Sequence, residues 1–344
     1  MKKKIFIGIA AVLLLSVLLF ALQALLVPKY ASNPEGLLTG QYYDSSLSHD
    51  VIAIGDCEVY ESIVPSVLWE KYGIRTYVRG GAQQLAWHSY YLLEETFRYE
   101  TPKVVLFNVY ALKYGTPQSE AYNRMTFDTM KWSASKMNGI LDSMTSDESI
   151  VDYVFPILRY HSRITDLKEE DLRDWFSEPE NMTDNGYLIK TGVIPMPESD
   201  PIDAPPEELL PESSMEYLDK MRALCKEKGS ELVLIKAPTN SRGYWWYDEW
   251  EAQIVDYATE HSLAYHNFIP LADEMGIDWQ TDTYDGGLHL NVYGAEKFTE
   301  YLGAVLSEHH GLESQKGDAQ ASKVWNGYLK DFENKKKQLE DIDK

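Results

Sequence analysis

From residue 51 onward, apolar and polar positions alternate between two patterns. Short apolar runs rich in β-branched residues predict buried strands, and apolar residues three or four positions apart predict amphipathic helices. The expected strands are 51–55, 74–78, 103–110, 231–238 and 263–268. The expected helices between and after them are 66–73, 84–99, 215–229, 246–262 and 294–310. Strands that alternate with helices favour parallel pairing through crossovers, so we expect an α/β fold with a doubly wound, flavodoxin-like parallel sheet of five strands.

The alternation is interrupted in three places. Residues from about 111 to 205 are rich in Met, Asp, Tyr and polar residues, and the chain becomes rich in Pro and Glu near 194–212. We interpret 111–205 as a long insertion after the third strand, and such insertions often cover active sites. Residues 29–48 carry Pro, Gly, Ser and Tyr without periodicity, which indicates an irregular linker. After about residue 319, apolar residues at helical spacing predict a docking helix with a charged, frayed end.

The N-terminal segment is almost purely apolar. Residues 5–27 contain only Ser16 and Gln23 as polar interruptions, and three lysines precede them. At about 1.5 Å per residue this run spans roughly 35 Å, which is enough to cross a bilayer. Its length and the lack of a convincing small-x-small site favour an uncleaved signal anchor, with cleavage by signal peptidase as the alternative. The lysines predict a cytoplasmic N-terminus and an extracytoplasmic main domain.

These patterns divide the chain into four parts. Residues 1–28 are the cytoplasmic stub and transmembrane anchor, and 29–48 are the linker. Residues 49–312 are the α/β domain, and 313–344 are the helical tail.

Composition narrows the function. Lysine and arginine number 32 against 54 aspartates and glutamates, a formal net charge of −22. So acidic a surface repels phosphate backbones, so nucleic acid is not an expected partner. Cys57 and Cys225 are the only cysteines, too few for a disulfide framework, although a bridge between them stays open. The histidines lack zinc-site spacing and no glycine-rich phosphate loop occurs, so we expect no metal and no cofactor.

Reactive residue types follow the predicted strands. In doubly wound sheets, ligands bind beyond the carboxyl ends of the strands. Cys57 follows the first strand in VIAIGDCEVYES, and Asp285 and His289 follow the fifth in DTYDGGLHLN. A nucleophile, a base and an orienting acid are what acyl transfer requires, and backbone N–H groups or an Asn amide stabilise the oxyanion. The other polar or turn residues expected at this edge are Gly81, Gln84, Asn108 and Lys236.

These blocks resemble the SGNH (GDSL-type) esterase and acyltransferase superfamily. The matching pieces are Gly55-Asp56-Cys57, the Gly80-Gly81 turn, Asn108, and Asp285 with His289-Leu290-Asn291. The anchor and the segments PSVLWEKYGI and GGLHLNVYGAEKFT are similar to a branch found in Gram-positive bacteria. That branch is related to the D-alanyl transfer protein of teichoic acid modification and to alginate-type O-acetyltransferases. The resemblance covers roughly residues 50–110 and 213–310.

The resemblance implies an extracytoplasmic acyl-ester hydrolase or O-acyltransferase that acts on a cell-surface polysaccharide. Some members of the superfamily act beside a membrane-bound O-acyltransferase. Carried over, Cys57 is the nucleophile and, through its backbone N–H, an oxyanion donor. His289 is then the general base and Asp285 its orienting group, with Gly81 and Asn108 as further oxyanion donors. Transfer is preferred to hydrolysis on the resemblance alone.

The chain departs from the family pattern in three ways. Cys57 replaces serine, and Asp285 stands four rather than three residues before His289. The third block reads FNVY around Asn108, where the family has Gly-x-Asn-Asp. A thiolate is a strong nucleophile that needs less help from a base, and a bulge at DGGLH would bring Asp285 back. Two alternatives stay open: a catalytically inactive module that binds a glycan or an export partner, and a thiol esterase for soluble esters.

Four further residues are candidate substrate contacts. Gln84 and Lys236 belong to the predicted sheet edge. His161 and Arg163 follow an apolar run in FPILRYHSRI, inside the expected insertion. Such a polar pair suits a substrate or an anionic glycan, and a surface helix is the alternative.

Overall fold

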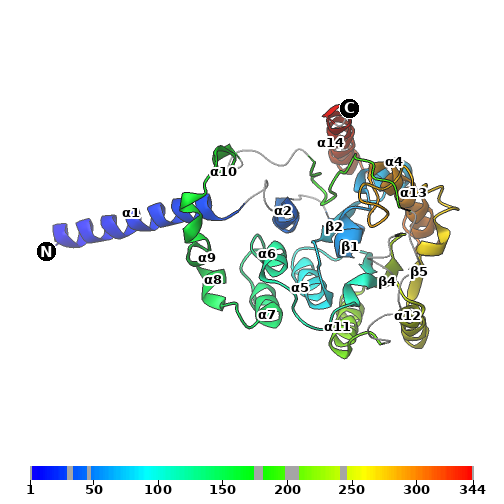
Figure 1. The fold of residues 1–344 in the computed structure, drawn as a ribbon, viewed down its shortest axis with the longest axis horizontal. Helices are drawn as coiled ribbons and strands as arrows, with labels where there is room; N and C mark the ends of the chain where they lie inside the picture. The colour runs from blue at the N-terminus through cyan, green and yellow to red at the C-terminus, as the bar shows by residue number, and fades with distance from the viewer. Residues whose placement is uncertain are drawn as a thin grey trace.

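The chain folds around a parallel sheet. The structure, a computed structural model, describes residues 2–28, 34–44, 48–173, 181–197, 209–240 and 246–342. Within them the sheet has five strands in the order β2-β1-β3-β4-β5, all parallel (Figure 1). The strands are β1 (Val51–Gly55), β2 (Thr76–Gly80), β3 (Val104–Asn108), β4 (Glu231–Lys236) and β5 (Ala264–Asn267). The predicted α/β class and five-stranded parallel sheet are therefore confirmed.

Alternate residues along the strands pack into two hydrophobic cores, one on each face of the sheet. On β3, Val104 and Leu106 belong to one core, and Val105 and Phe107 to the other. The first face is covered by α4 (Pro65–Tyr72), α13 (Val292–His309) and α14 (Ala319–Ile342). The opposite face is covered by α5 (Ala86–Thr96), α11 (Glu212–Lys228) and α12 (Asp248–His261). Burial on both faces explains why β1, β3 and β4 read as nearly continuous apolar runs.

Two glycines end helices just before strands. Gly73 closes α4 with φ +69°, and Gly229 closes α11 with φ +76°. Only a residue without a Cβ adopts this left-handed conformation at little cost, and it lets the chain reverse within a few residues. The links from α4 to β2 and from α11 to β4 are therefore short. Because all five strands are parallel, their carboxyl ends lie at one edge of the sheet.

Three sequence expectations need correction. Strand β2 lies at Thr76–Gly80 rather than 74–78, because the Ile74 N–H bonds to the Leu68 carbonyl and closes α4 instead. The described part of the 29–48 linker is helical, as α2 (Pro34–Gln41) and the 3-10 turn η1 (Tyr42–Asp44). The expected docking helix of the tail is present, and its charged end is also helical, since α14 (Ala319–Ile342) continues to Ile342.

Burial explains the last two differences. Leu38 and Tyr42 are buried against β2, where the Tyr77 hydroxyl donates to the Leu38 carbonyl at 3.3 Å. In α14, Trp325 and Phe332 are buried, and near the end of the helix Leu339 packs on the first core and Glu340 accepts the Tyr293 hydroxyl at 3.1 Å. These contacts remove large apolar side chains from water, which local sequence periodicity does not reveal.

Between β3 and α11 the chain forms a series of short helices. They are η2 (Val109–Leu112), α6 (Glu120–Phe127), α7 (Ala134–Ser143), α8 (Ile150–Val154), α9 (Ile157–Tyr160), η3 (His161–Thr165) and α10 (Glu169–Arg173). Residues 181–197 then run past β2 toward the loop before α13, with the Val78 N–H bonded to the Asn185 carbonyl and the Ile194 N–H to Thr283. Parts of the expected insertion, 174–180 and 198–205, lie outside the described residues.

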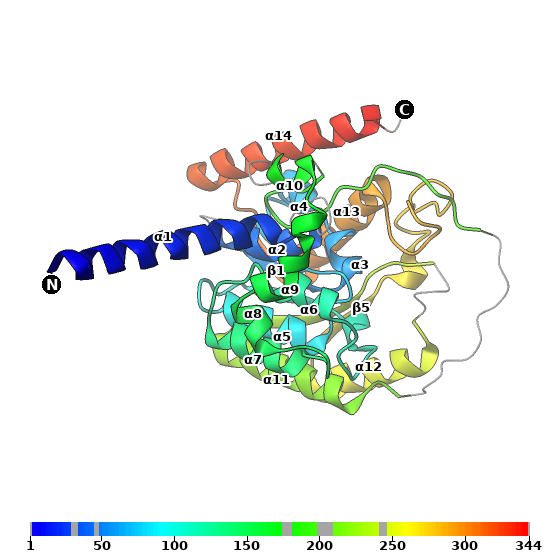
Figure 2. The same cartoon turned by 60° about the vertical axis from the view of Figure 1, so that its left-hand side comes forward.

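The N-terminal helix α1 (Lys2–Leu26) projects from the body of the molecule (Figures 1 and 2). It is long and apolar enough to cross a membrane. Most of its length is exposed, and its C-terminal end packs against α9, η3 and α10.

Candidate active site

The turn after β1 holds Cys57 at the carboxyl edge of the sheet. A Cβ on Gly55 would lie 2.7 Å from Cγ2 of Val59 and 2.9 Å from Cβ of Asn108, so glycine is a steric requirement at this position. Because Gly55 has no side chain, the short helix α3 (Cys57–Tyr60) can begin directly after the strand. As the first residue of α3, Cys57 has a backbone N–H that no helical carbonyl accepts.

The loop before α13 brings Asp285 onto His289. Gly286 and Gly287 have φ of +79° and +93°, which folds the loop back on itself. Asp285 Oδ1 accepts the backbone N–H of His289 at 2.8 Å, and Oδ2 lies 2.6 Å from His289 Nδ1. The two glycines thus compensate for the four-residue spacing between the acid and the histidine.

Cys57, His289 and Asp285 form a continuous chain of contacts. The Nε2 atom of His289 lies 3.0 Å from Sγ of Cys57, across 232 positions of sequence. Cys57 is 6% exposed and His289 8%, so both are nearly shielded from water. With Nδ1–H donated to the carboxylate, Nε2 lies against the sulfur in the position to take the thiol proton, as activation of a nucleophile requires. The structure therefore brings together the three residues expected to act, while their catalytic roles stay predictions.

Burial and charge oppose each other at this pair. Burial raises the pKa of the Cys57 thiol; His289 lowers it, while Asp56 and Glu61 add to the rise. Burial disfavours a charge on His289, but the Cys57 sulfur, Asp285 and Glu61 outweigh this and raise the pKa of His289 well above its usual range. The site therefore favours a positive charge on the imidazole once the thiol has given up its proton, and His289 is the group that makes a thiolate accessible.

Two residues that the sequence did not single out complete the surroundings of His289. Glu61 is buried, and its Oε2 lies 3.5 Å from His289 Nδ1. The Tyr284 hydroxyl donates to the same oxygen at 2.8 Å. The Tyr284 and His289 rings stack with centroids 6.0 Å apart and planes 16° apart. Glu61 stands one helical turn after Cys57, a spacing that becomes informative only once α3 is known to begin at Cys57.

A cluster of buried polar side chains adjoins the turn that carries Cys57. The Asn108 amide donates to Asp56 Oδ1 at 3.0 Å and to Glu58 Oε2 at 2.8 Å, and its oxygen accepts the Ala237 N–H at 3.1 Å. The Lys236 ammonium lies 2.8 Å from each Glu58 oxygen and from the Ala237 carbonyl. The side chains of Asn108 and Lys236 thus hold Asp56 and Glu58, the residues on either side of Cys57. The predicted oxyanion role of Asn108 and substrate role of Lys236 would require these bonds to be shared.

Gly81 and Gln84 lie in the turn after β2, at the same edge. The Gln84 amide donates to the Arg79 carbonyl and to Oγ of Ser89, both at 3.1 Å. Its Oε1 would lie 3.4 Å from a Cβ on Gly81. Gln84 is fully buried, so it braces the turn, and the predicted substrate and oxyanion roles of the two residues stay predictions.

His161 and Arg163 do not join this group. Arg163 donates to the carbonyl of Leu26, the last residue of α1, and pairs with Asp171 at 2.7 Å. His161 Nδ1 lies 2.7 Å from the Leu158 carbonyl. Figure 1 places their segment beside α1, on the opposite side of the molecule from α13, the helix that follows His289. A direct contact with a substrate on Cys57 is therefore incompatible with this arrangement.

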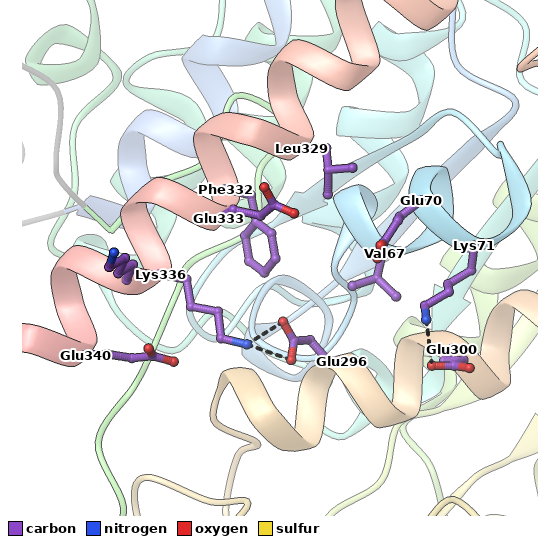
Figure 3. Close-up of a pocket in the computed structure, with 11 residues that line it drawn as sticks. Val67, Glu70, Lys71, Glu296, Glu300, Leu329, Phe332, Glu333, Lys336 and Glu340 are labelled. Atoms are coloured by element: carbon purple, nitrogen blue, oxygen red, sulfur yellow. Dashed lines mark hydrogen bonds and ion pairs between the residues drawn. The ribbon is translucent and has the colours of Figure 1, made fainter.

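Two grooves open near the sheet. One, of about 600 Å³, borders Tyr284 and is lined mainly by residues 189–194, with Asn181 and Leu339. The other, of about 390 Å³, lies between α4, α13 and α14 (Figure 3). It is crossed by ion pairs, Lys71 with Glu300 and Lys336 with Glu296, and its lining shares no residue with the Cys57–His289–Asp285 group. The groove beside Tyr284 is the one adjoining the candidate site.

No family model matches this chain, and no curated protein matches it. The SGNH assignment therefore stays a prediction that depends on the sequence blocks.

Replacing His289 with alanine should slow alkylation of Cys57 near neutral pH. Because His289 lowers the pKa of the thiol, its loss leaves burial unopposed and shifts the midpoint of the rate-versus-pH profile upward. The measurement is the iodoacetamide reaction rate across pH in a Cys225→Ser background. His309→Ala, an exposed histidine of α13, is the matched control. Equal midpoints in the two variants would contradict the coupling of sulfur and ring.

Both Asp285→Asn and Glu61→Gln should lower the pKa of His289, because each removes a carboxylate that stabilises the imidazolium. The larger drop is expected for Asp285→Asn, whose oxygen lies at 2.6 Å rather than 3.5 Å. The measurement is an NMR titration of labelled histidine, with Glu296→Gln in the other groove as control. An unchanged titration of His289 in Glu61→Gln would show that Glu61 does not act on the ring.

Proposed function

We propose that this chain is an acyl-ester enzyme of the SGNH type that acts outside the cytoplasm. It forms a thioester on Cys57 and passes the acyl group to a hydroxyl of a cell-surface polysaccharide, or to water. The observation that carries the proposal is the contact chain from Cys57 Sγ through His289 to Asp285, at 3.0 Å and 2.6 Å. Its position beyond the carboxyl ends of parallel strands supports the same conclusion.

The residues suit a two-step transfer. In the first step Sγ attacks the ester carbonyl while His289 Nε2 takes the thiol proton, and the departing alcohol receives that proton. In the second step the acceptor hydroxyl loses its proton to Nε2 and attacks the thioester, and the sulfur leaves and regains the proton. Asp285 and Glu61 stabilise the imidazolium in both steps. The backbone N–H groups of Cys57 and Gly81 are the proposed oxyanion donors.

The surroundings are consistent with a surface polysaccharide as acceptor. Helix α1 would anchor the domain in the cytoplasmic membrane, close to a membrane-bound O-acyltransferase that supplies acyl groups. The groove beside Tyr284 offers a path for an extended chain, since Tyr284 both lines it and stacks on His289. Its lining includes Lys190, Thr191 and Asn181, which suit hydroxyl groups.

A catalytically inactive module that binds a glycan or an export partner is the second candidate. The raised pKa of the Cys57 thiol and the engagement of the Asn108 amide by Asp56 and Glu58 favour it. A thiol esterase for soluble esters shares the first chemical step and differs in the acceptor.

The full chain in detergent, mixed with an aryl acetate, should acquire one acetyl group on Cys57 that hydroxylamine removes. His289→Ala should slow this acylation by about 10²–10⁴-fold, the usual contribution of a general base. Intact-mass spectrometry follows the adduct, and Cys225→Ala serves as control because burial raises the pKa of that thiol to about 12.

Three outcomes separate the candidates. Failure of Cys57 to acylate, while iodoacetamide still modifies it, would favour the inactive module. Rapid turnover to acetate with no transfer to added oligosaccharides would favour the esterase. Transfer that disappears in Cys57→Ala supports the proposal.

A further inference from the structure

Residues 150–173, which include α8, α9, η3 and α10, expose several large apolar side chains. We call this segment the collar. Six of its large apolar side chains are between 40% and 58% exposed, although each is large enough to be buried in a core. They are Val151, Val154, Phe155, Leu158, Ile164 and Leu172. Soluble proteins rarely leave such a patch uncovered, and exposed apolar patches often mark interaction sites for proteins or membranes.

The collar lies against the C-terminal end of α1. Helices α9, η3 and α10 pack on α1, and Arg163 bonds to the carbonyl of Leu26. The helix is exposed from Lys2 to Phe20, part-buried from Ala21, and buried at Leu26. Figures 1 and 2 both show the collar beside this end of α1. The collar therefore contacts only the last turns of the apolar helix.

The length of α1 sets the level of the collar relative to a bilayer. The hydrocarbon core takes about 20 helical residues at about 1.5 Å each. Counted from Ile5, the first apolar residue after the lysines, the core ends near Ala24. Contact with the collar begins at Ala21, so the collar lies at the boundary between hydrocarbon and headgroups. Its exposed Phe155, Leu158 and Ile164 side chains are then in the region where a lipid surface covers them.

Charge does not supply this attraction. Within the collar, Arg163 is paired with Asp171, and Arg159 is paired with Glu120 of α6. The whole chain carries −22. The collar sequence carries five carboxylates against four cations: Asp152, Asp166, Glu169, Glu170 and Asp171 against Arg159, Arg163, Lys168 and Arg173. A surface without excess positive charge but with exposed apolar side chains binds through apolar burial, so it does not need anionic lipid.

We propose that the collar is a shallow membrane-binding surface that lies on the bilayer at the outer end of α1. It holds the α/β domain in one orientation on the membrane rather than on a free tether. The proposal concerns the membrane placement of α1 and is independent of the chemistry at Cys57.

Depth-dependent quenching in neutral-lipid vesicles tests the collar in the full chain. An environment-sensitive fluorophore is attached to Phe155→Cys or Leu158→Cys in a Cys57→Ser/Cys225→Ser background. We expect the emission of the collar label to be blue-shifted when vesicles are present. Spin labels near the headgroups should quench most of this emission, and high salt should change neither result. Val255→Cys on α12, a similarly exposed apolar site, is the matched control and should not respond. Leu14→Cys in α1 reports the anchor and should respond to deep spin labels.

The outcomes separate the collar from the anchor. If the Leu14 label is quenched but the collar labels, like the Val255 label, are not, the collar proposal is overturned and the anchor stands. No quenching at Leu14 would overturn both. Collar quenching only with anionic lipid would show that charge rather than apolar burial drives contact, which would overturn the proposal that the collar binds through its apolar side chains.

Discussion

The 3.0 Å contact between Cys57 Sγ and His289 Nε2 joins the first strand of the α/β domain to the start of its helix α13. Two backbone features make this contact possible. At Gly55 the absence of a Cβ lets the chain pass close to Val59 and Asn108 and begin α3 at the strand end. At Gly286 and Gly287 positive φ values fold the loop so that Asp285 meets His289. The parallel sheet places both features at one edge, and the buried pair of Glu58 and Lys236 supports the turn below them.

The same contact explains the electrostatic character of the site. A buried thiol resists ionisation, and the nearby Asp56 and Glu61 carboxylates oppose it further. An imidazolium offsets both effects, and it is in turn stabilised by Asp285 and Glu61. The nearby carboxylates therefore stabilise a positive charge on the His289 ring and do not stabilise a negative charge on the Cys57 sulfur. Such a site depends more on its histidine than an exposed low-pKa cysteine does. A cysteine nucleophile at this position is therefore compatible with the base-dependent mechanism proposed above.

Much of the fold followed from local patterns, and the rest depended on contacts distant in sequence. The apolar runs of β1, β3 and β4 predicted strands because these strands are buried on both faces, whereas β5 is only half-buried. Strand β2 was displaced because Ile74 is used to close α4, a cap that apolar periodicity does not register. The helix α2 forms because Leu38 and Tyr42 pack on β2, a tertiary effect on a weakly patterned segment.

The site was predictable to a similar extent. Cys57, Asp285 and His289 were found because their residue types follow strands that end at one edge. Glu61 and Tyr284 were missed because their roles depend on where α3 begins and how the glycine loop folds. Arg163 was predicted to contact the substrate, but its side chain bonds to the end of α1. The residues next to Arg163 in the sequence do not indicate this contact.

Chemistry at Cys57 is tested most directly by the ester-linked acyl groups of the cell envelope. Strains producing equal amounts of the wild-type chain, Cys57→Ala and Cys225→Ala are compared for base-labile acyl groups on surface polysaccharide. If Cys57 carries the acyl group, only Cys57→Ala changes the acyl content, and Cys225→Ala matches the wild type. Identical acyl content in all three strains would contradict acyl transfer through Cys57.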